Sequence, residues 1–218
     1  YMPIDKNFII ALDGPAASGK GTLARRLADH YNLALLDTGA LYRAVGWTVL
    51  MAGGDPENIN DAIKAVDELH NTDLSNPELR SESIGAAASK VAAIPAVRCA
   101  LVHYQRSFAH SPPKDKSGTI LDGRDIGTVI CPDAPIKIFI TADVEIRAKR
   151  RFLEEYGANG SVQEYQRILT DLRSRDERDI NRTSSPLAQA ENAYLIDTTY
   201  SDIEAVFEAA VSFVSSKM

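Results

Sequence analysis

Nine residues near the start of the chain, Gly14 to Thr22, have the composition and spacing of a loop that binds phosphate groups. An apolar run precedes them (Phe8–Leu12), and a run with helical periodicity follows (Leu23–Ala28). Glycines let backbone N–H groups surround an anion, the helix start adds the positive end of its dipole, and Lys20 adds a mobile charge. The alternative is an ordinary turn between a strand and a helix. The order of strand, glycine loop and helix favours phosphate binding.

A second segment with chemical potential begins at Thr119. Thr119–Asp122 reads as an apolar strand that ends in a carboxylate, the expected position of an acidic residue that holds hydrated Mg²⁺ beside a phosphate loop. Glycines on both sides of Arg124 and Asp125 would let the backbone approach a ligand, with both side chains pointing into a crevice. A plain turn is the alternative. Asp122 is therefore the candidate for Mg²⁺, and Arg124 and Asp125 are candidates for substrate binding.

A third group of polar residues follows the apolar run Leu33–Leu36. It consists of Asp37, Thr38, Tyr42 and Arg43. In a parallel sheet, ligands bind outside the carboxyl ends of the strands, so this group should lie beside the glycine loop, where a phosphate acceptor is expected. Capping of a helix by Asp37 and Thr38, and a solvent-exposed helix face for Arg43, are the alternatives.

Eight of the fifteen arginines lie between residues 147 and 182. Residues 143–182 are expected to form two helices joined at Gly157–Gly160, and we call this segment the arginine hairpin. Helical spacing places its charges on two faces, made of Arg147, Arg150 and Arg151 and of Arg175, Arg178, Asp179 and Arg182. Acidic neighbours make a helix pair with surface ion pairs the alternative. Beside a phosphate loop, the pattern favours a lid that closes over transferring phosphates.

The elements that must position these residues form an α/β pattern. Five apolar runs alternate with helical patterns, which predicts a parallel sheet of about five strands with helices on both faces. The predicted strands are Phe8–Leu12, Leu33–Leu36, Thr119–Asp122, Ile136–Ile140 and Ala193–Ile196. An amphipathic helix is expected over Ile203–Val214. A single domain is the default for 218 residues, with a core of residues 1–57, 111–142 and 183–218.

Residues 58–110, which we call the helical insertion, show helical periodicity without a clear strand. One predicted helix carries Ala62, Ile63, Val66 and Leu69 on a single face, a second carries Ile84, Ala87, Ala88 and Val91, and Pro95 precedes a third. The polar candidates in this segment are Ser89, Lys90, Arg98 and Arg106. Solvent exposure is the alternative for each of them.

Composition limits the kind of partner. Hydrophobic residues make up 44% of the chain and charged residues 25%, and the formal net charge is −6. The mean hydropathy of −0.18 and the pI near 5.3 argue against non-specific binding of a polynucleotide. No apolar run reaches about 18 residues and no basic-then-apolar leader is evident, so we expect a cytoplasmic protein without a membrane span. A monomer is expected. Cys99 and Cys131 lack the spacing of a metal site, and the four histidines receive no role.

Several segments together resemble the bacterial cytidylate kinases, which transfer a phosphoryl group from ATP to CMP or dCMP. These segments are GPAASGKGTLA, LLDTGALYRA, AASKVAAIPAVR, LDGRDIGTV, PDAPIKIFITA and RSRDERDINR. GKGT is shared by nucleoside monophosphate kinases in general, whereas DTGALYR, DGRDIGTV and RDERDINR together are specific to this branch. The similarity runs from about Ile9 to Lys217. It implies a P-loop nucleoside monophosphate kinase fold, with the helical insertion binding the monophosphate and the arginine hairpin as lid.

The resemblance also implies roles for individual residues. ATP would be bound by Gly14, Pro15, Ala16, Ala17, Ser18, Gly19, Lys20, Gly21 and Thr22. The CMP phosphate would be held by Arg43, Arg124 and Arg182 in a pocket lined by Thr38 and Tyr42, the cytosine edge would be read by Ser89, Arg98 and Asp125, and the sugar hydroxyl would contact Asp179. Arg147, Arg151 and Arg175 would belong to the lid and the transferred phosphate, so the catalytic residues would be Lys20, Arg124, Arg151 and Arg175. Mg²⁺ would lie near Thr22 and Asp122, bound directly or through water, because Gly21 occupies the position where many phosphate loops have Ser or Thr.

This chemistry needs charge neutralisation, alignment and exclusion of water, and little covalent help from the protein. A nucleoside monophosphate already carries a nucleophilic phosphate oxygen, so no catalytic base is required. Cytosine has an amino donor where uracil has an acceptor, which makes the Asp125 carboxylate a sensible discriminator. Two alternatives remain: a kinase for another small acceptor, which leaves RDERDINR without a role, and a nucleotide-dependent switch, for which no guanine-reading NKxD segment is present.

Overall fold

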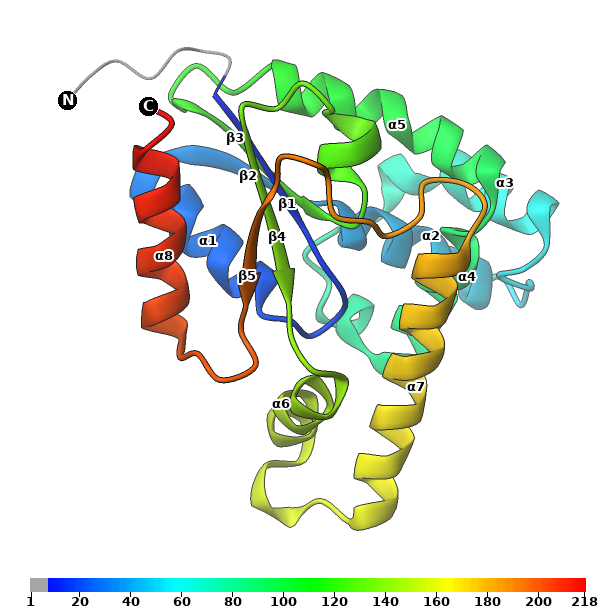
Figure 1. Cartoon of the computed structure of the whole chain (residues 1–218). Helices are drawn as coiled ribbons and strands as arrows, with labels where there is room; N and C mark the ends of the chain where they lie inside the picture. The colour runs from blue at the N-terminus through cyan, green and yellow to red at the C-terminus, as the bar shows by residue number, and fades with distance from the viewer. Residues whose placement is uncertain (1–7) are drawn as a thin grey trace.

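The computed structural model describes residues 8–218, so expectations about the first seven residues, including the start of the core and the lack of a leader, lie outside it. Five parallel strands form one sheet in the order β2-β3-β1-β4-β5 (Figure 1). Their bounds are β1 Ile9–Asp13, β2 Leu33–Asp37, β3 Gly118–Gly123, β4 Ile136–Thr141 and β5 Tyr194–Asp197. All five predicted strands are confirmed, each within about one residue of its expected bounds.

Helices cover both faces of this sheet. On one face lie α1 (Lys20–Tyr31) and α8 (Ile203–Ser215), and on the other α2 (Thr38–Met51) and α5 (Pro95–His110) (Figure 1). Successive side chains of a strand point to opposite faces, so Ile10 and Leu12 pack with α1 and α8, whereas Ile9 and Ala11 pack with α2 and α5. Burial on both faces explains the unbroken apolar run of β1.

The helical insertion contains no strand, as expected. It holds α3 (Ile59–Asp67), the 3₁₀ turns η1 (Leu69–Asn71) and η2 (Pro77–Arg80), α4 (Glu82–Val91) and α5, which starts at Pro95. The placement of Leu69 on the first helix is wrong. The chain tightens after Asp67 into three-residue turns, with the amide of Asn71 donating to the carbonyl of Glu68 at 3.0 Å, so Leu69 packs from η1 instead.

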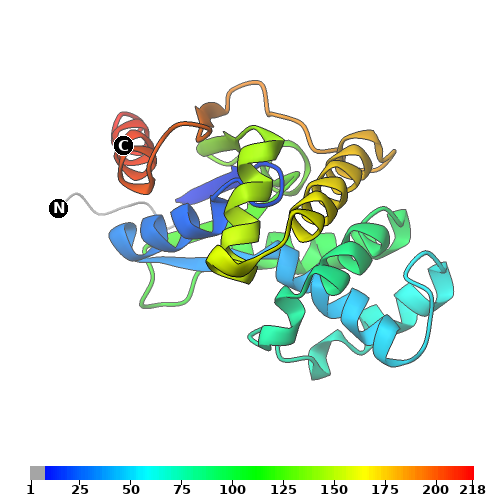
Figure 2. The same cartoon turned by 90° about the horizontal axis from the view of Figure 1, so that it is seen from below.

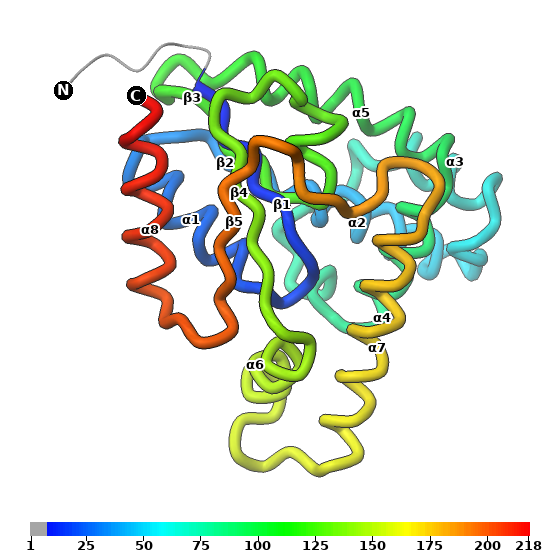
Figure 3. Tube along the Cα trace, viewed as in Figure 1, coloured from blue at the N-terminus to red at the C-terminus, as the bar shows by residue number. Residues whose placement is uncertain are grey.

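The arginine hairpin forms the two predicted helices, α6 (Val144–Tyr156) and α7 (Val162–Asn181), joined by the turn η4 (Gly157–Asn159). Asp143 caps α6, and Ser161 with Glu164 forms a reciprocal capping box at the start of α7. The hairpin follows β4 and lies beyond the carboxyl ends of the strands (Figure 3). Seen from that end, α7 lies beside α4 of the helical insertion (Figure 2). Glycine loop, insertion and hairpin thus meet at one edge of the sheet.

In the described part of the chain, no single helix has both the length and the apolar composition needed to cross a membrane. Only α4 and α5 together pass that test, and they are bent by 98° relative to each other.

Candidate active site

The glycine loop has the geometry expected between β1 and α1. At Gly14 φ is +151°, and a Cβ atom there would lie 2.0 Å from the carbonyl oxygen of Ile140, so only glycine fits beside β4. Gly19 has φ +94° at the start of α1. The Ser18 hydroxyl and the Lys20 ammonium both donate to the carbonyl of Pro15 at 2.9 Å. The loop is therefore fixed by its own side chains.

Lys20 places a buried positive charge inside the loop. Its side chain is 6% exposed, and Nζ lies 3.8 Å from Oδ1 of Asp122 at the end of β3. Burial, followed by repulsion from Arg124, lowers the pKa of Lys20 to about 7, against the attraction of Asp122. Burial likewise raises the pKa of Asp122, and repulsion from the carboxylate of Asp37 raises it further. The site thus concentrates charges that a bound polyphosphate with its cation would relieve.

This burial predicts a pH-dependent stability difference for Lys20→Met. A folded-state pKa of about 7, against 10.5 for free lysine, means that the buried ammonium destabilises the fold fully below pH 7, and that this penalty disappears as pH rises from 7 toward 10.5. We expect the free energy of unfolding of the variant to exceed that of wild type by about 2–4 kcal/mol at pH 7, and by only about 1 kcal/mol at pH 9.5. Urea unfolding at both pH values measures this. The prediction is contradicted if the stability difference between variant and wild type is the same at both pH values. It is also contradicted if the difference is no larger than that of the exposed control Lys64→Met.

Several arginines converge next to the loop. Arg43 comes from α2, Arg124 from the end of β3 and Arg175 from α7, and all three line a cleft of about 820 Å³ together with the glycine loop. Within residues 8–218, the buried Nε atoms of Arg43 and Arg175 have no hydrogen-bond acceptor. Burial, then repulsion by Arg124, lowers the pKa of Arg175 to about 9. Buried guanidinium donors without acceptors suit an anion such as a phosphate group.

A second cavity, of about 40 Å³, lies beside the arginines. Asp125 and Arg98 form a buried ion pair on its wall, and the Arg98 guanidinium lies 5.3 Å above the ring of Tyr42. Asp179 accepts from Nε of Arg124 at 3.1 Å and from the hydroxyl of Ser89 at 3.5 Å. Predicted substrate-binding residues that line this cavity are Thr38, Tyr42, Ser89, Arg98, Arg124, Asp125, Asp179 and Arg182. Arg43 lies instead on the larger cleft.

The capping alternative holds for Asp37, whose carboxylate accepts from the amide of Ala40 at 3.3 Å, while it also lines the cleft. Thr38 donates to the carbonyl of Asp122 at 2.8 Å, which ties the start of α2 to the end of β3. Capping and a place in the site are therefore compatible here.

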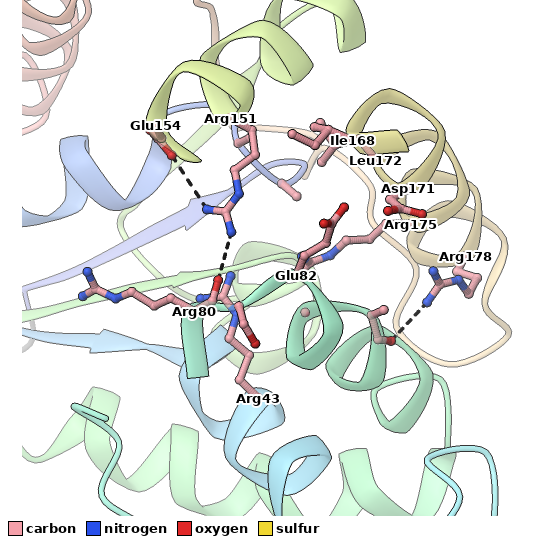
Figure 4. A pocket seen from close by; sticks show the side chains of 15 residues that line it. Arg43, Arg80, Glu82, Arg151, Glu154, Ile168, Asp171, Leu172, Arg175 and Arg178 are labelled. Carbon is pink, nitrogen blue, oxygen red and sulfur yellow. Dashed lines mark hydrogen bonds and ion pairs between the residues drawn. The ribbon is translucent and has the colours of Figure 1, made fainter. Parts of the chain in front are cut away.

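The arginines of the arginine hairpin have two different kinds of surroundings: Arg147 makes structural contacts, whereas Arg151 lines the cleft. The buried Arg147 donates to the carbonyl of Ala16 at 3.1 Å and pairs with Asp176, so it joins the glycine loop to both hairpin helices. Arg151 lines the cleft, and its Nη2 donates to the carbonyl of Arg80 in the helical insertion at 2.9 Å (Figure 4). The surface ion-pair alternative also holds in part, because Arg151 contacts Glu155 at 2.6 Å.

Sequence reasoning missed three features of the site. Arg80 of the insertion lines the cleft, and its carbonyl accepts the hydrogen bond from Arg151 (Figure 4). The start of α8 also lines the cleft, and there Arg26 and Glu204 form a two-bond ion pair at 2.8 and 2.9 Å. Asp13, at the end of β1, is 4% exposed. A carboxylate directly before Gly14 was the available signal for Asp13, whereas the other two depend on long-range packing.

A parallel sheet with a glycine loop after β1, and buried arginines gathered beside that loop, is the arrangement of a P-loop kinase that acts on a small phosphorylated acceptor. The chain belongs to the cytidylate kinase family, whose model matches residues 10–216.

Two bacterial relatives illustrate the similarity. The chain is 51% identical to a cytidylate kinase from Paramagnetospirillum magneticum over 96% of this chain and 98% of the relative. It is 52% identical to a cytidylate kinase from Brucella suis biovar 1, over 95% and 92%. Among solved structures, an uncharacterized protein from Eubacterium ventriosum matches with a TM-score of 0.54 at 18% identity, covering 96% of this chain and 99% of that chain, which supports the fold alone.

Proposed function

We propose that this protein is a cytidylate kinase, which transfers the γ-phosphoryl group of ATP to CMP or dCMP and yields CDP or dCDP. The observation that carries the proposal is the joining of two anion sites. The Lys20 loop faces the same cleft as the buried arginines Arg43, Arg124 and Arg175. The similarity to named cytidylate kinases over nearly the whole chain supports the choice of acceptor.

In this proposal the glycine loop holds the ATP phosphates, and Arg43, Arg124 and Arg182 hold the CMP phosphate. An oxygen of CMP attacks the γ-phosphorus, the bond from that phosphorus to the β–γ bridging oxygen breaks, and ADP leaves with the electron pair. Lys20 neutralises charge on the donor side, and Arg151 and Arg175 do so around the transferred group. No proton must be removed from the nucleophile, which agrees with the lack of a proposed catalytic base.

The Arg98–Asp125 pair is proposed to read the base. Asp125 would accept a hydrogen bond from the cytosine amino group, Arg98 would donate to ring acceptors, and Ser89 would complete the edge. Uracil presents an acceptor to Asp125 and is disfavoured, because two acceptors would then face each other in a buried site. Asp179, beside Ser89 and Arg124, is assigned to the sugar hydroxyl.

Magnesium is proposed to bind next to Lys20. Residues 8–218 contain no group of three His, Cys, Asp or Glu side chains arranged to hold a metal ion by themselves. Asp122 has a raised pKa and lies close to Gly21, with its Oδ2 3.6 Å from the position of a Cβ there. This fits a cation held mainly by ATP and water, with Asp122 and Thr22 as the protein contacts. When bound, Mg²⁺ would neutralise phosphate charge.

Removing Mg²⁺ with a chelator should abolish phosphoryl transfer, and adding it back should restore it. Asp122→Asn should raise the Mg²⁺ concentration for half-maximal activity by about 10- to 100-fold, the usual effect of losing a supporting carboxylate. Initial rates across a Mg²⁺ titration measure this at saturating ATP and CMP. Asp29→Asn, an exposed change on α1, is the control. An unchanged Mg²⁺ requirement in Asp122→Asn would contradict the assignment.

The helical insertion (58–110) and the arginine hairpin (143–182) are proposed to move relative to the core. The smaller cavity, at about 40 Å³, is far below the roughly 300 Å³ of small-molecule sites, so CMP needs it to widen. The two segments are joined by polar contacts, from Arg151 to the carbonyl of Arg80, from Arg178 to the carbonyl of Ala86 at 3.4 Å, from Ser89 to Asp179 at 3.5 Å and between Arg167 and Glu82 at 3.3 Å. Opening would have to break these contacts. We also propose a cytoplasmic monomer that acts on free nucleotides, a state that size-exclusion chromatography tests.

Product analysis separates this proposal from a nucleotide-dependent switch. Incubation with ATP, CMP and Mg²⁺ should yield CDP and ADP in equal amounts. Formation of ADP and inorganic phosphate without CDP would favour the switch, provided that no other monophosphate in place of CMP yields a diphosphate either. That outcome would contradict the kinase proposal.

A further inference from the structure

Asp13 lies between the two halves of the site without belonging to either. It is the last residue of β1, directly before Gly14, and its Cα pairs in register with that of Gly123, the residue before Arg124. Strand β1 is the central strand, between β3 and β4. The side chain is 4% exposed and therefore buried at the base of the site.

Both carboxylate oxygens of Asp13 bind the backbone that follows Asp125. Oδ1 accepts from the amide of Ile126 at 2.8 Å, and Oδ2 accepts from the amide of Gly127 at 2.7 Å. These amides begin the turn η3 (Ile126–Ile130), and the first amides of a helical turn have no carbonyl acceptor within it. One planar carboxylate thus fixes both the position and the orientation of the turn.

No cation is paired with this carboxylate among the described residues. Burial raises the pKa of Asp13 to about 7, while the two amides act in the opposite direction. A buried carboxylate without a cation is costly, and a neutral side chain would fill the space at lower cost. Asp13 therefore serves the backbone of η3 rather than an ion pair.

From this geometry we propose that Asp13 is a positioning residue, which sets Arg124 and Asp125 at a fixed place relative to the glycine loop. The inference rests on the proposed CMP kinase function. Arg124 and Asp125 lie between the two points at which Asp13 holds the chain: the Gly123 pairing in the sheet and the Ile126–Gly127 amides. A displacement of about 1 Å at a positioned group can cost on the order of 100-fold in rate. The glycine loop is held separately, through the carbonyl of Pro15.

Asp13→Asn is the direct test, because it keeps the shape but turns one acceptor into a donor that faces an amide. We expect KM for CMP to rise about tenfold or more, KM for ATP to stay within about threefold, and the preference for CMP over UMP to narrow. If Asp13 contributed only to stability, the variant would not show this selective increase of the KM for CMP over the KM for ATP. Asp133→Asn, an exposed carboxylate shortly after the same turn, is the control expected to match wild type.

A double-mutant cycle with Asp125→Ala locates the effect. If Asp13 acts through this segment, its substitution should change CMP selectivity much less in the Asp125→Ala background than in wild type. Additive effects, or equal changes in the KM values of ATP and CMP, would overturn the proposal. If the Asp13→Asn variant does not fold, Asp13→Glu takes its place as the test. It keeps both acceptors but displaces them, and it should show the same CMP-specific defect. Absence of CMP phosphorylation in wild type would overturn the proposed function itself, whereas active wild type with unaltered Asp13 variants overturns only the role of Asp13.

Discussion

Replacing Lys20 with alanine should lower kcat for CMP phosphorylation by about 1,000-fold or more. Its ammonium is the one lysine charge in the glycine loop, buried and held by the carbonyl of Pro15 at 2.9 Å. Charge on the transferring phosphates shifts in the transition state, and loss of one preorganised donor there typically costs roughly 100- to 1,000-fold. Bound phosphates favour the charged form of Lys20, and loss of a full positive charge beside them should reach or exceed the upper end of this range.

This loss should occur without unfolding, because removal of a buried ammonium relieves the fold at pH 7. The measurement is kcat at saturating ATP, CMP and Mg²⁺, accompanied by a thermal melt. Lys64→Ala, an exposed change on α3, serves as control. A folded Lys20→Ala enzyme that retains more than about a tenth of wild-type kcat would show that the loop lysine has little share in catalysis.

Replacing Asp125 with alanine should chiefly weaken the recognition of CMP, measured as kcat/KM. Its carboxylate is buried and pairs with Arg98, so both the proposed contact to the cytosine amino group and the position of Arg98 depend on it. Truncating one partner of a buried charged pair costs about 2–5 kcal/mol, which corresponds to roughly 30- to 5,000-fold in kcat/KM for CMP. UMP never offers Asp125 a donor at that position, so its kcat/KM should fall less, and the CMP preference should narrow.

The Asp125→Ala variant leaves the buried guanidinium of Arg98 without its carboxylate partner, which could destabilise the fold. Asp125→Asn keeps the volume and offers one acceptor, so it should fall between wild type and Asp125→Ala. Circular dichroism of both variants checks the fold. An unchanged ratio of kcat/KM for CMP and UMP in folded Asp125→Ala would remove Asp125 from base recognition.

The strands and the position of the glycine loop could be predicted because local patterns determine them. β1 is buried on both faces and is therefore uniformly apolar, and Gly14 is confined by the carbonyl of Ile140. The parallel sheet then brings the ends of β1, β2 and β3 to one edge, which accounts for the correct grouping of Asp37, Asp122 and Arg124.

The division of labour within that group could not be predicted, because it depends on contacts between segments far apart in the chain. Helical spacing placed Arg147 and Arg151 on one face, but only packing against Asp176 and Ala16 makes Arg147 an anchor. Likewise, the role of Asp13 depends on a turn more than a hundred residues away, and a carboxylate directly before Gly14 does not by itself reveal that contact.

The acceptor site is proposed to select CMP over other nucleoside monophosphates. A comparison of kcat/KM for CMP, dCMP, UMP, AMP and GMP with ATP and Mg²⁺ tests it most directly. We expect CMP and dCMP to be phosphorylated at least about tenfold more efficiently than the others. A buried carboxylate facing the base should favour the amino group of cytosine over the oxygen of uracil, and the small acceptor cavity should disfavour the larger purines. AMP or UMP as the preferred acceptor would contradict the assignment of the site.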